Sequence, residues 1–348
     1  MIRYKISLNP VDWFFFGGEQ TFDNGKSQSY FATSNPFPQQ TALLGMIRYQ
    51  LLRSTGLLFS GDKEHDQSIT PKANALVGER SFDIDAKEPQ SFGCIKAISP
   101  VFIQKGDRRL VPMPLTHNID ISFSDGRVWL SGKQCESIIS APAFKEKTYN
   151  NYNLFIDNTG KPWDQDDIFA ASTQVGITKA DASDKNEKGF FKQNILRFKD
   201  NDTCFAFYLD LDVDDETRLK PQQFVFLGAQ QSCFYMECSI CDEEPFVPDH
   251  PEGSILLCNH TYISDAESLN ANCLQHWSGT ISFRNLKNDN TGRLRSGAVA
   301  YRRHGSLCTF LTAGSVIFYS DEKQLKILTS LLTKPNLQNI GYNTFNIK

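Results

Sequence analysis

The sequence predicts an α+β protein built mainly from antiparallel strands. Short runs of alternating apolar and polar residues recur along the chain, and several are joined by turn sequences typical of hairpins. Helical patterns are few, and strands do not alternate regularly with long helices as they do in a doubly wound sheet. The 348 residues fall into two halves of similar length, which is enough chain for two domains or one large one.

The clearest helix follows Pro36 and Pro38. Proline is tolerated in a first helical turn and disfavours helix before it, so the helix is expected over residues 38–54. Its apolar positions recur with the helical period, and the face that they form should be buried. These positions are Leu43, Leu44, Ile47 and Leu51.

The opposite face of this helix carries Thr41, Gly45 and Arg48. Glycine inside an exposed helix costs about 1 kcal/mol relative to alanine, so we expect something to pack against Gly45. A phosphate is one candidate, because an arginine and a threonine lie beside it. A neighbouring strand packed closely on the helix is the other.

The remaining pattern is mostly β. Hairpin turns are expected at residues 105–108 and 124–127, and a longer charged loop at 179–188. Residues 57–92 show no clear period, and we expect an irregular insertion there with one short helix. Strands are expected at residues 2–8, 175–177, 189–198, 203–213, 223–227, 232–239 and 253–259, and further helices at 163–171 and 324–332.

Charge is distributed unevenly along the chain, although the net charge is only −4. Residues 200–270 hold fifteen Asp and Glu against two Lys and Arg, whereas residues 281–304 hold six Lys and Arg against one Asp. A basic stripe on an acidic protein suits one defined anionic ligand better than general nucleic-acid binding. The alternative is a solvated loop that pairs with the acidic half. The candidates in the stripe are Arg293, Arg295, Arg302 and Arg303.

Metal and cofactor motifs are weak in this sequence. Cys238 and Cys241 form a close pair, but a second zinc-binding pair is incomplete. The acidic run 210–216 resembles the start of a calcium loop, yet Asp215 stands where glycine is required and Pro221 where glutamate is required. We therefore expect neither a metal nor a cofactor.

Catalytic motifs are also absent from the sequence. It contains no P-loop, nucleophile elbow, zincin motif or dinucleotide fingerprint. His304 alone among the histidines lies in a basic setting, where it could cleave RNA as a general base or support a phosphate site. Because these motifs are missing, we expect a non-enzymatic protein. No run of 18 apolar residues and no signal peptide is found, so we also expect a cytoplasmic protein without a membrane partner.

Five collinear blocks resemble one known family. They are FFFGGEQTFDNG with PFPQQTALLGMIR, ISPVFIQKGDRRLVPMP, QVGITK with GFFKQNILRF, FLGAQQS, and FLTAGSVIFYS with IGYNTF. In this order they resemble the third subunit of the Cmr complex, a RAMP-superfamily family of type III-B CRISPR effectors. Residues 57–92 and 240–280 lie outside the likeness.

The resemblance implies two ferredoxin-like (RRM-like) domains, over residues 1–160 and 161–348, with a projecting β-hairpin at about 175–198. It implies a non-catalytic subunit that binds and caps the 5′ tag of the crRNA and meets target RNA only indirectly. Its protein partners would be the large polymerase-like subunit and the backbone RAMP subunit. Two alternatives stay open: a crRNA-processing RAMP endonuclease, and a protein scaffold that does not contact RNA.

Residue by residue, Gly45 and Arg48 match the family's first helix, and Gly176 and Lys179 match the base of its hairpin. Gly228 matches a glycine turn, but Ala229, Gln230 and Gln231 replace a glycine and a charged pair there, so any phosphate would depend on backbone amides. Phe190, Phe191 and Tyr301 are candidates for base stacking, although each is more often a core residue. The RNA-binding residues expected are Thr41, Gly45, Arg48, Gly176, Lys179, Gly228, Gln230, Arg293, Arg295, Arg302 and Arg303.

Overall fold

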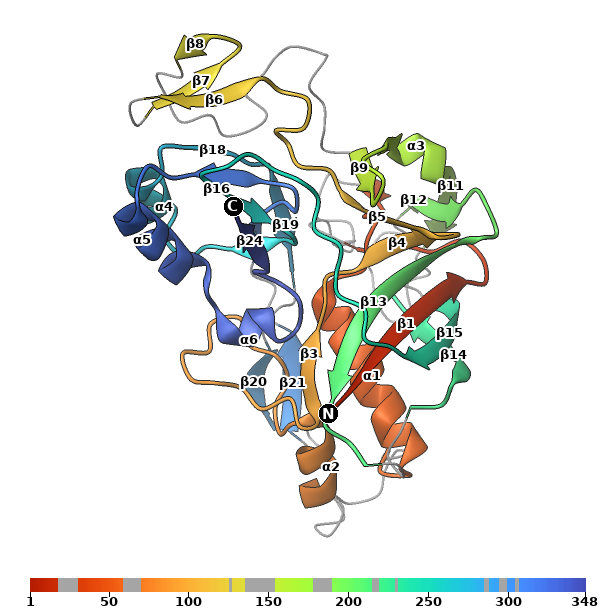
Figure 1. Ribbon diagram of the computed structural model, residues 1–348. Helices are drawn as coiled ribbons and strands as arrows, with labels where there is room; N and C mark the ends of the chain where they lie inside the picture. The colour runs from red at the N-terminus through yellow and green to blue at the C-terminus, as the bar shows by residue number, and fades with distance from the viewer. Residues whose placement is uncertain are drawn as a thin grey trace.

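The largest sheet takes its strands from distant parts of the chain (Figure 1). The computed structural model describes residues 1–17, 31–58, 70–124, 127–134, 154–177, 190–214, 219–228, 231–284, 288–293, 299–303 and 307–348. Side by side, the strands of this sheet are β10 (Pro162–Asp164), β9 (Leu154–Asp157), β5 (Arg108–Pro112), β4 (Phe102–Lys105), β13 (Thr203–Leu211), β1 (Ile2–Pro10), β15 (Ser232–Ile240) and β14 (Gln222–Leu227), with β3 (Ile95–Ile98) also paired to β13.

β1 lies in the middle of this sheet and pairs antiparallel with both β13 and β15. Ile6, for example, lies opposite Phe207 on one side and Cys238 on the other. Because alternate residues of a strand point to opposite faces, Ile6 and Leu8 enter the core, where both are fully buried. Pairing in this sheet therefore crosses residue 160, and where the chain divides into domains stays a prediction.

The helix expected after Pro38 is α1 (Gln40–Ser54), and it covers the inner face of the sheet next to β14. All four residues of its predicted apolar stripe are at most 2% exposed. They pack with Phe205 and Phe234 in the main core cluster. The prolines before the helix and the helical period of its apolar residues were sufficient to locate this element.

A second lobe is formed by two small sheets and three helices. Its core packs Leu328 and Leu332 against Ile255 and Ile317. One sheet has the order β18 (Gln275–Trp277), β23 (Val316–Phe318), β16 (Ser254–Leu257) and β24 (Phe345–Ile347), and the other β17 (Thr261–Tyr262), β22 (Cys308–Leu311) and β19 (Thr280–Phe283). The helices are α4 (Ala266–Asn272), α5 (Glu322–Leu332) and α6 (Pro335–Gln338).

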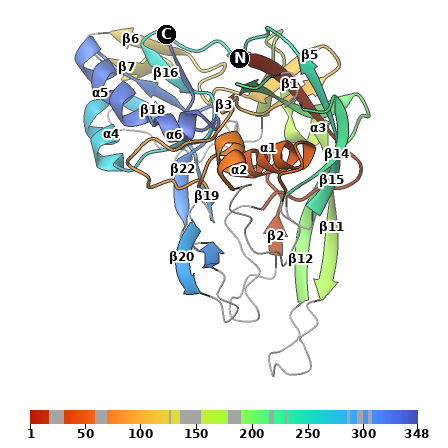
Figure 2. The same ribbon diagram turned by 90° about the horizontal axis from the view of Figure 1, so that it is seen from below.

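Smaller elements project from these two lobes (Figure 2). A three-stranded sheet has the order β11 (Phe169–Ile177), β12 (Phe190–Phe198) and β2 (Phe31–Thr33), and β20 (Asn288–Arg293) pairs with β21 (Val299–Arg303). β6 (Ile121–Ser124), β7 (Arg127–Leu130) and β8 (Lys133–Gln134) form a further small sheet. The remaining helices are α2 (Thr70–Val77) and α3 (Gln165–Ile168).

The structure is thus mixed α and β with more strand than helix, and both expected hairpins are present as β4–β5 and β6–β7. The helix expected over 163–171 is much shorter. The side chain of Asp164 caps α3 by accepting a hydrogen bond from Asp166 N, and the chain returns to strand at Phe169 because that residue is buried beside Phe198. In the irregular insertion, the expected short helix is α2.

Candidate nucleic-acid interface

The exposed face of α1 is open at Gly45. A Cβ atom built on this glycine meets no heavy atom of the described residues within 4 Å, so none of them supplies the neighbouring backbone considered from the sequence. Thr41, one turn earlier, is partly buried, and Tyr49, one turn later, is 46% exposed. Close packing by a described neighbour therefore does not explain the glycine, and a ligand at this position stays a prediction.

Arg48 extends from α1 toward the segment that follows α2. Its guanidinium carbon lies 5.6 Å from the centre of the Phe92 ring, and a Cβ at Gly78 would lie 3.1 Å from its Nη2. Burial lowers the pKa of Arg48 to about 10, so the group keeps its charge at neutral pH. Its Nε and Nη2 are covered and have no hydrogen-bond partner in the described part of the chain. Unpaired buried donors cost stability, and the contact with the Phe92 ring offsets part of that cost.

Gly228 ends β14 with a φ of 83°, a conformation that favours glycine. A Cβ there would lie 2.6 Å from the carbonyl oxygen of Phe15 and 2.9 Å from the Phe16 ring. The turn therefore needs glycine both for its backbone angle and for its close approach to the segment before α1. Gln230, the next residue expected in this turn, lies outside the described residues.

The Phe14–Gly17 segment ties the start of α1 to the projecting sheet. Phe14 N donates to the Leu196 carbonyl oxygen at 2.8 Å, which places the segment beside β12. Phe16 N donates to Ser34 Oγ at 2.9 Å, and Gln39 Nε2 donates to the Gly17 carbonyl oxygen at 3.1 Å. The beginning of α1, the Gly228 turn and the base of the β11–β12 hairpin are therefore held as one unit.

The hairpin expected at about 175–198 is β11–β12. Gly176 lies opposite Phe191 near its outer end, and Lys179 lies outside the described residues. On one face of this sheet, Lys192 lies between Val175 on β11 and Phe31 on β2.

Lys192 is exposed, and Val175 and Phe31 are 58% and 45% exposed. Local sequence patterns do not indicate this group, because β2 joins β12 by a parallel pairing between distant segments. Phe190 and Phe191 lie in β12, but their side chains are outside what the structure describes.

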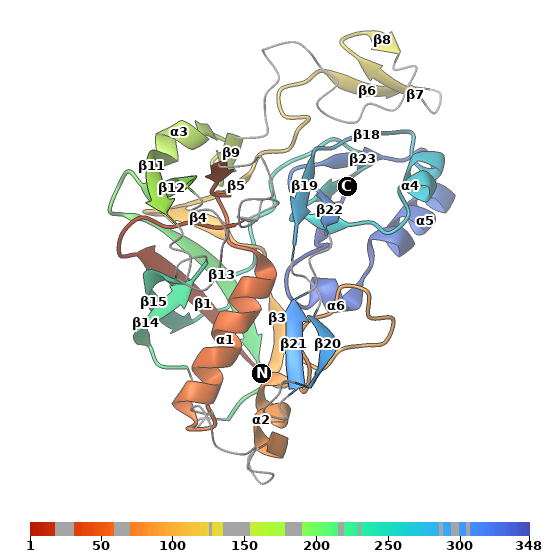
Figure 3. The ribbon, with the colours of Figure 1, turned by 180° about the vertical axis from the view of Figure 1, so that it is seen from behind.

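The basic stripe forms the β20–β21 pair. Arg302 lies opposite Asp289, Arg303 opposite Asn288, and Arg293 opposite Val299. Arg295 and His304 lie outside the described residues, as do the side chains of β20 and β21, Tyr301 included. Figures 2 and 3 show β20–β21 and β11–β12 projecting from the side of the molecule that carries α1, one on either flank of the helix.

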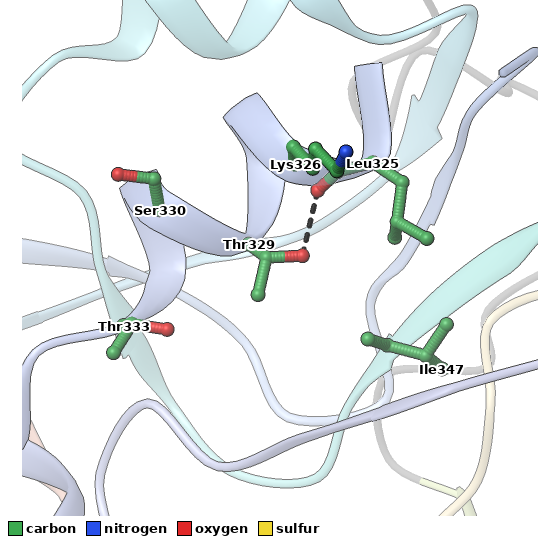
Figure 4. A pocket seen from close by; sticks show the side chains of 6 residues that line it. All are labelled: Leu325, Lys326, Thr329, Ser330, Thr333 and Ile347. Carbon is green, nitrogen blue, oxygen red and sulfur yellow. Dashed lines mark hydrogen bonds between the residues drawn. The ribbon is translucent and has the colours of Figure 1, made fainter. Parts of the chain in front are cut away.

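One hollow in the described part of the chain lies outside this interface. It has a volume of 520 Å³ and lies on α5, between Leu325, Thr329 and Ile347 (Figure 4). The Thr329 hydroxyl donates to the Leu325 carbonyl oxygen of its own helix at 2.6 Å, so it does not point a free donor into the hollow. One lysine, Lys326, is its only charged lining residue. This surface lacks the converging groups of a binding site.

The described ranges contain neither a metal-binding cluster nor a membrane-spanning helix. No group of three or more His, Cys, Asp or Glu side chains is placed to hold a metal ion there. Cys238 and Cys241 are free thiols, and burial raises the pKa of Cys238 to about 12. Within the same ranges, no helix has the length and hydrophobicity to span a bilayer.

Solved structures with a similar fold come from CRISPR assemblies. One chain, from the "Cryo-EM structure of the Type III-B Cmr-beta bound to cognate target RNA", has a TM-score of 0.51 and 16% identity over 99% of this chain and 96% of that chain. A second, from Cmr-beta with cognate target RNA and AMPPnP, has a TM-score of 0.48, 16% identity and coverage of 99% and 95%. No curated protein matches the sequence.

The first of these likenesses identifies the fold as that of a chain in a type III-B Cmr assembly. The sequence model of the family described as "CRISPR-associated protein (Cas_Cmr3)" matches residues 6–125 and 122–347. The chain therefore belongs to this CRISPR-associated family, and the resemblance to the third Cmr subunit is confirmed.

Proposed function

We propose that this protein is a non-catalytic subunit of a type III-B CRISPR effector complex that binds and caps the 5′ tag of the crRNA. The family match over nearly the whole chain carries this proposal. In the complex, the subunit bridges the large polymerase-like subunit to the backbone RAMP subunit, meets target RNA only indirectly, and works in the cytoplasm. Each half is built on a ferredoxin-like unit, and β1 followed by α1 packed on the main sheet supports the first of them.

The α1 side of the molecule suits a single-stranded RNA. Gly45 leaves room for a phosphate on the helix surface, and the half-buried Arg48, which packs against Phe92, adds positive charge to the next turn of the same helix. The Gly228 turn brings backbone amides to the same region, and Phe31 beside Lys192 provides a ring for a base and a cation for the backbone. The arginines of β20–β21 add charge on the other flank.

The proposal is tested by binding of the purified chain to a short RNA that carries the repeat-derived 5′ tag. A scrambled RNA of the same length and composition serves as the control, and both RNAs are run on a denaturing gel afterwards. Tag-selective binding with intact RNA is expected. Equal binding to both RNAs would contradict tag recognition.

The same experiment separates the alternatives. RNA that is cut by the wild-type chain and left intact by His304→Ala would favour the processing endonuclease. A protein partner that binds equally well after all RNA is removed, together with no RNA binding by the chain, would favour the scaffold without RNA contact.

A further inference from the structure

Two exposed phenylalanines lie on the outer strand of the main sheet. Phe224 and Phe226 in β14 are 58% and 59% exposed, whereas Val225 and Leu227 beside them are buried. β14 ends the strand order of the sheet, and Figures 1 and 3 show it at the outer side, next to β15. The alternation therefore turns two aromatic rings to solvent at a sheet edge.

The backbone of the same two residues also faces outward. Cys238 N donates to the Pro221 carbonyl oxygen at 2.8 Å, which makes Pro221 and Cys238 a hydrogen-bonded pair of the ladder. Such pairs recur at every second residue of an antiparallel ladder, so Val225 bonds to Phe234. The N–H and C=O groups of Phe224 and Phe226 point away from β15, and no backbone partner takes them in the described part of the chain.

The rings belong to a larger apolar surface, here called the aromatic edge patch. Phe226 lies opposite Cys233, and Phe224 lies opposite Tyr235 with the two ring centres 5.4 Å apart. Val11, whose N–H donates to the Cys233 carbonyl oxygen, is 58% exposed. The patch consists of Val11, Phe224, Phe226, Cys233 and Tyr235.

The opposite edge of the sheet is protected against pairing. β10 has only three residues and begins with Pro162, which lacks an N–H donor. The six residues of β14 carry two phenylalanines and include neither proline nor lysine, although the exposed Lys220 and Pro221 come directly before them, and Pro221 bonds toward β15 rather than outward. Natural edge strands are usually blunted by proline, lysine or short length, so an unblunted edge indicates one that is covered by a partner.

Acidic groups flank the patch. Asp12 is exposed beside Val11, and Glu237 is exposed on the next row, where Asn9 and Gln222 donate to it at 3.5 and 3.2 Å. Lys5, on the same face of β1, lies 3.5 Å from Glu243. This charge opposes a phosphate backbone and attracts a basic protein segment.

We propose that β14 receives an additional strand from another protein subunit. The added segment is extended, with apolar side chains at alternate positions over Phe224 and Phe226 and a Lys or Arg facing Glu237. Backbone hydrogen bonds to Phe224 and Phe226 supply affinity, and the patch supplies specificity. The inference rests on the proposed function in one respect, that the chain works inside an assembly of several proteins.

Hydrogen exchange of the β14 amides tests the proposal. The free chain, the chain with tag RNA alone and the assembled effector complex are compared. The amides of Phe224 and Phe226 should exchange at least about tenfold more slowly in the complex than in the free chain, and RNA alone should leave them unchanged. Exchange that is equally fast in the complex, or slowed by RNA alone, would overturn the proposal.

Two substitutions separate strand addition from simple packing of rings. Phe224→Ala and Phe224→Pro both remove the ring, but only proline removes the outward N–H, and neither breaks the ladder to β15. We expect Phe224→Pro to reduce co-purification of the chain with the complex by about tenfold relative to Phe224→Ala, the cost of one hydrogen bond. Equal losses for the two variants would reject strand addition.

Ile347 provides a matched control. It is 42% exposed on β24, an edge strand of the second lobe, and its N–H also points outward because Ser254 and Lys348 form the adjacent hydrogen-bonded pair. Ile347→Pro should leave co-purification with the complex unchanged. A loss as large as that of Phe224→Pro would mean that proline at any exposed edge strand impairs assembly, and it would reject strand addition at β14.

All variants should keep the wild-type affinity for tag RNA. If the wild-type chain does not bind the tag selectively but its β14 amides are still protected in the complex, the proposed function is wrong and the inference on β14 holds. If the isolated chain dimerises and Phe224→Ala abolishes the dimer, the strand that pairs with β14 comes from a second copy of this chain. That result would overturn the proposal of a different subunit.

Discussion

The indole Nε1 of Trp163 donates a hydrogen bond to Oδ2 of Asp157 at 3.0 Å, across the β9–β10 turn. The carboxylate also accepts from Thr159 Oγ1 at 2.6 Å, Lys161 N at 3.0 Å and Arg108 Nη1 at 2.6 Å. Burial by itself would raise the pKa of this fully buried group, but the donors outweigh it and hold the pKa well below its usual range. This network fixes the turn that leads into α3 and the projecting hairpin.

Asp157→Asn should destabilise the protein. The substitution removes the negative charge that pairs with Arg108 and turns one acceptor into a donor that faces other donors. Because Arg108 is 42% exposed and can be solvated, the main cost is the loss of hydrogen bonds to a buried charged group, about 2 kcal/mol, which urea unfolding at pH 7 would measure. Asp107→Asn, in the exposed β4–β5 turn, is the control and should change the unfolding free energy by less than about 0.5 kcal/mol.

The same carboxylate should contribute to the pH dependence of stability. Because its folded-state pKa is lowered, its stabilisation is complete above the pKa of the unfolded chain, about 4, and is lost as the pH falls toward the folded-state value. Wild-type stability should therefore fall more steeply below pH 4 than that of Asp157→Asn. If the unfolding free energies of the two proteins change in parallel with pH, the pKa of Asp157 is not lowered in the folded state.

Arg48→Met should raise stability and weaken RNA binding. The substitution keeps much of the packing volume and removes two buried donors without partners, a gain of about 1–3 kcal/mol, against about 1 kcal/mol lost from the contact with Phe92. Thermal unfolding and binding of tag RNA measure the two effects. Lys326→Met, on the exposed face of α5, should change neither, and equal RNA affinities for the two variants would remove Arg48 from the site.

Gly45 and Gly228 should respond to alanine in opposite ways. A Cβ at Gly45 meets nothing, so Gly45→Ala should stabilise the free chain by about 1 kcal/mol. A Cβ at Gly228 meets the Phe15 carbonyl oxygen at 2.6 Å and requires a left-handed backbone, so Gly228→Ala should cost more than about 1 kcal/mol.

RNA binding distinguishes the two reasons for a glycine in α1. If a phosphate packs against Gly45, Gly45→Ala should weaken tag binding despite its greater stability. Unchanged binding would mean that the RNA does not approach this turn of the helix.

Salt dependence should count the phosphate contacts of the basic stripe. For a single strand, each contact contributes about 0.7 to the slope of log K against log salt. Arg303→Gln should lower the slope by about that amount, and Arg302→Gln by less, because Arg302 lies opposite Asp289. Titrations at four salt concentrations would measure both slopes. A slope that neither substitution changes would place the RNA away from β20–β21.

The sequence predicted those features that depend on neighbouring residues in the chain. The prolines and the period of Leu43, Leu44, Ile47 and Leu51 located α1 and its buried face, and turn residues located the β4–β5 hairpin. The family likeness could be drawn from five blocks in order. Each of these is a local pattern, which a helix or a hairpin imposes on the residues within it.

Tertiary structure alone decided what depends on pairing between distant segments. β1 lies between β13 and β15, Lys192 lies beside Phe31, and Arg48 lies against Phe92 instead of the open helix face. Alternation tells which face of a strand is apolar, but it does not name the strand that pairs with it or the register of that pair. Those choices follow from how the whole core packs, so they are made only when the chain folds.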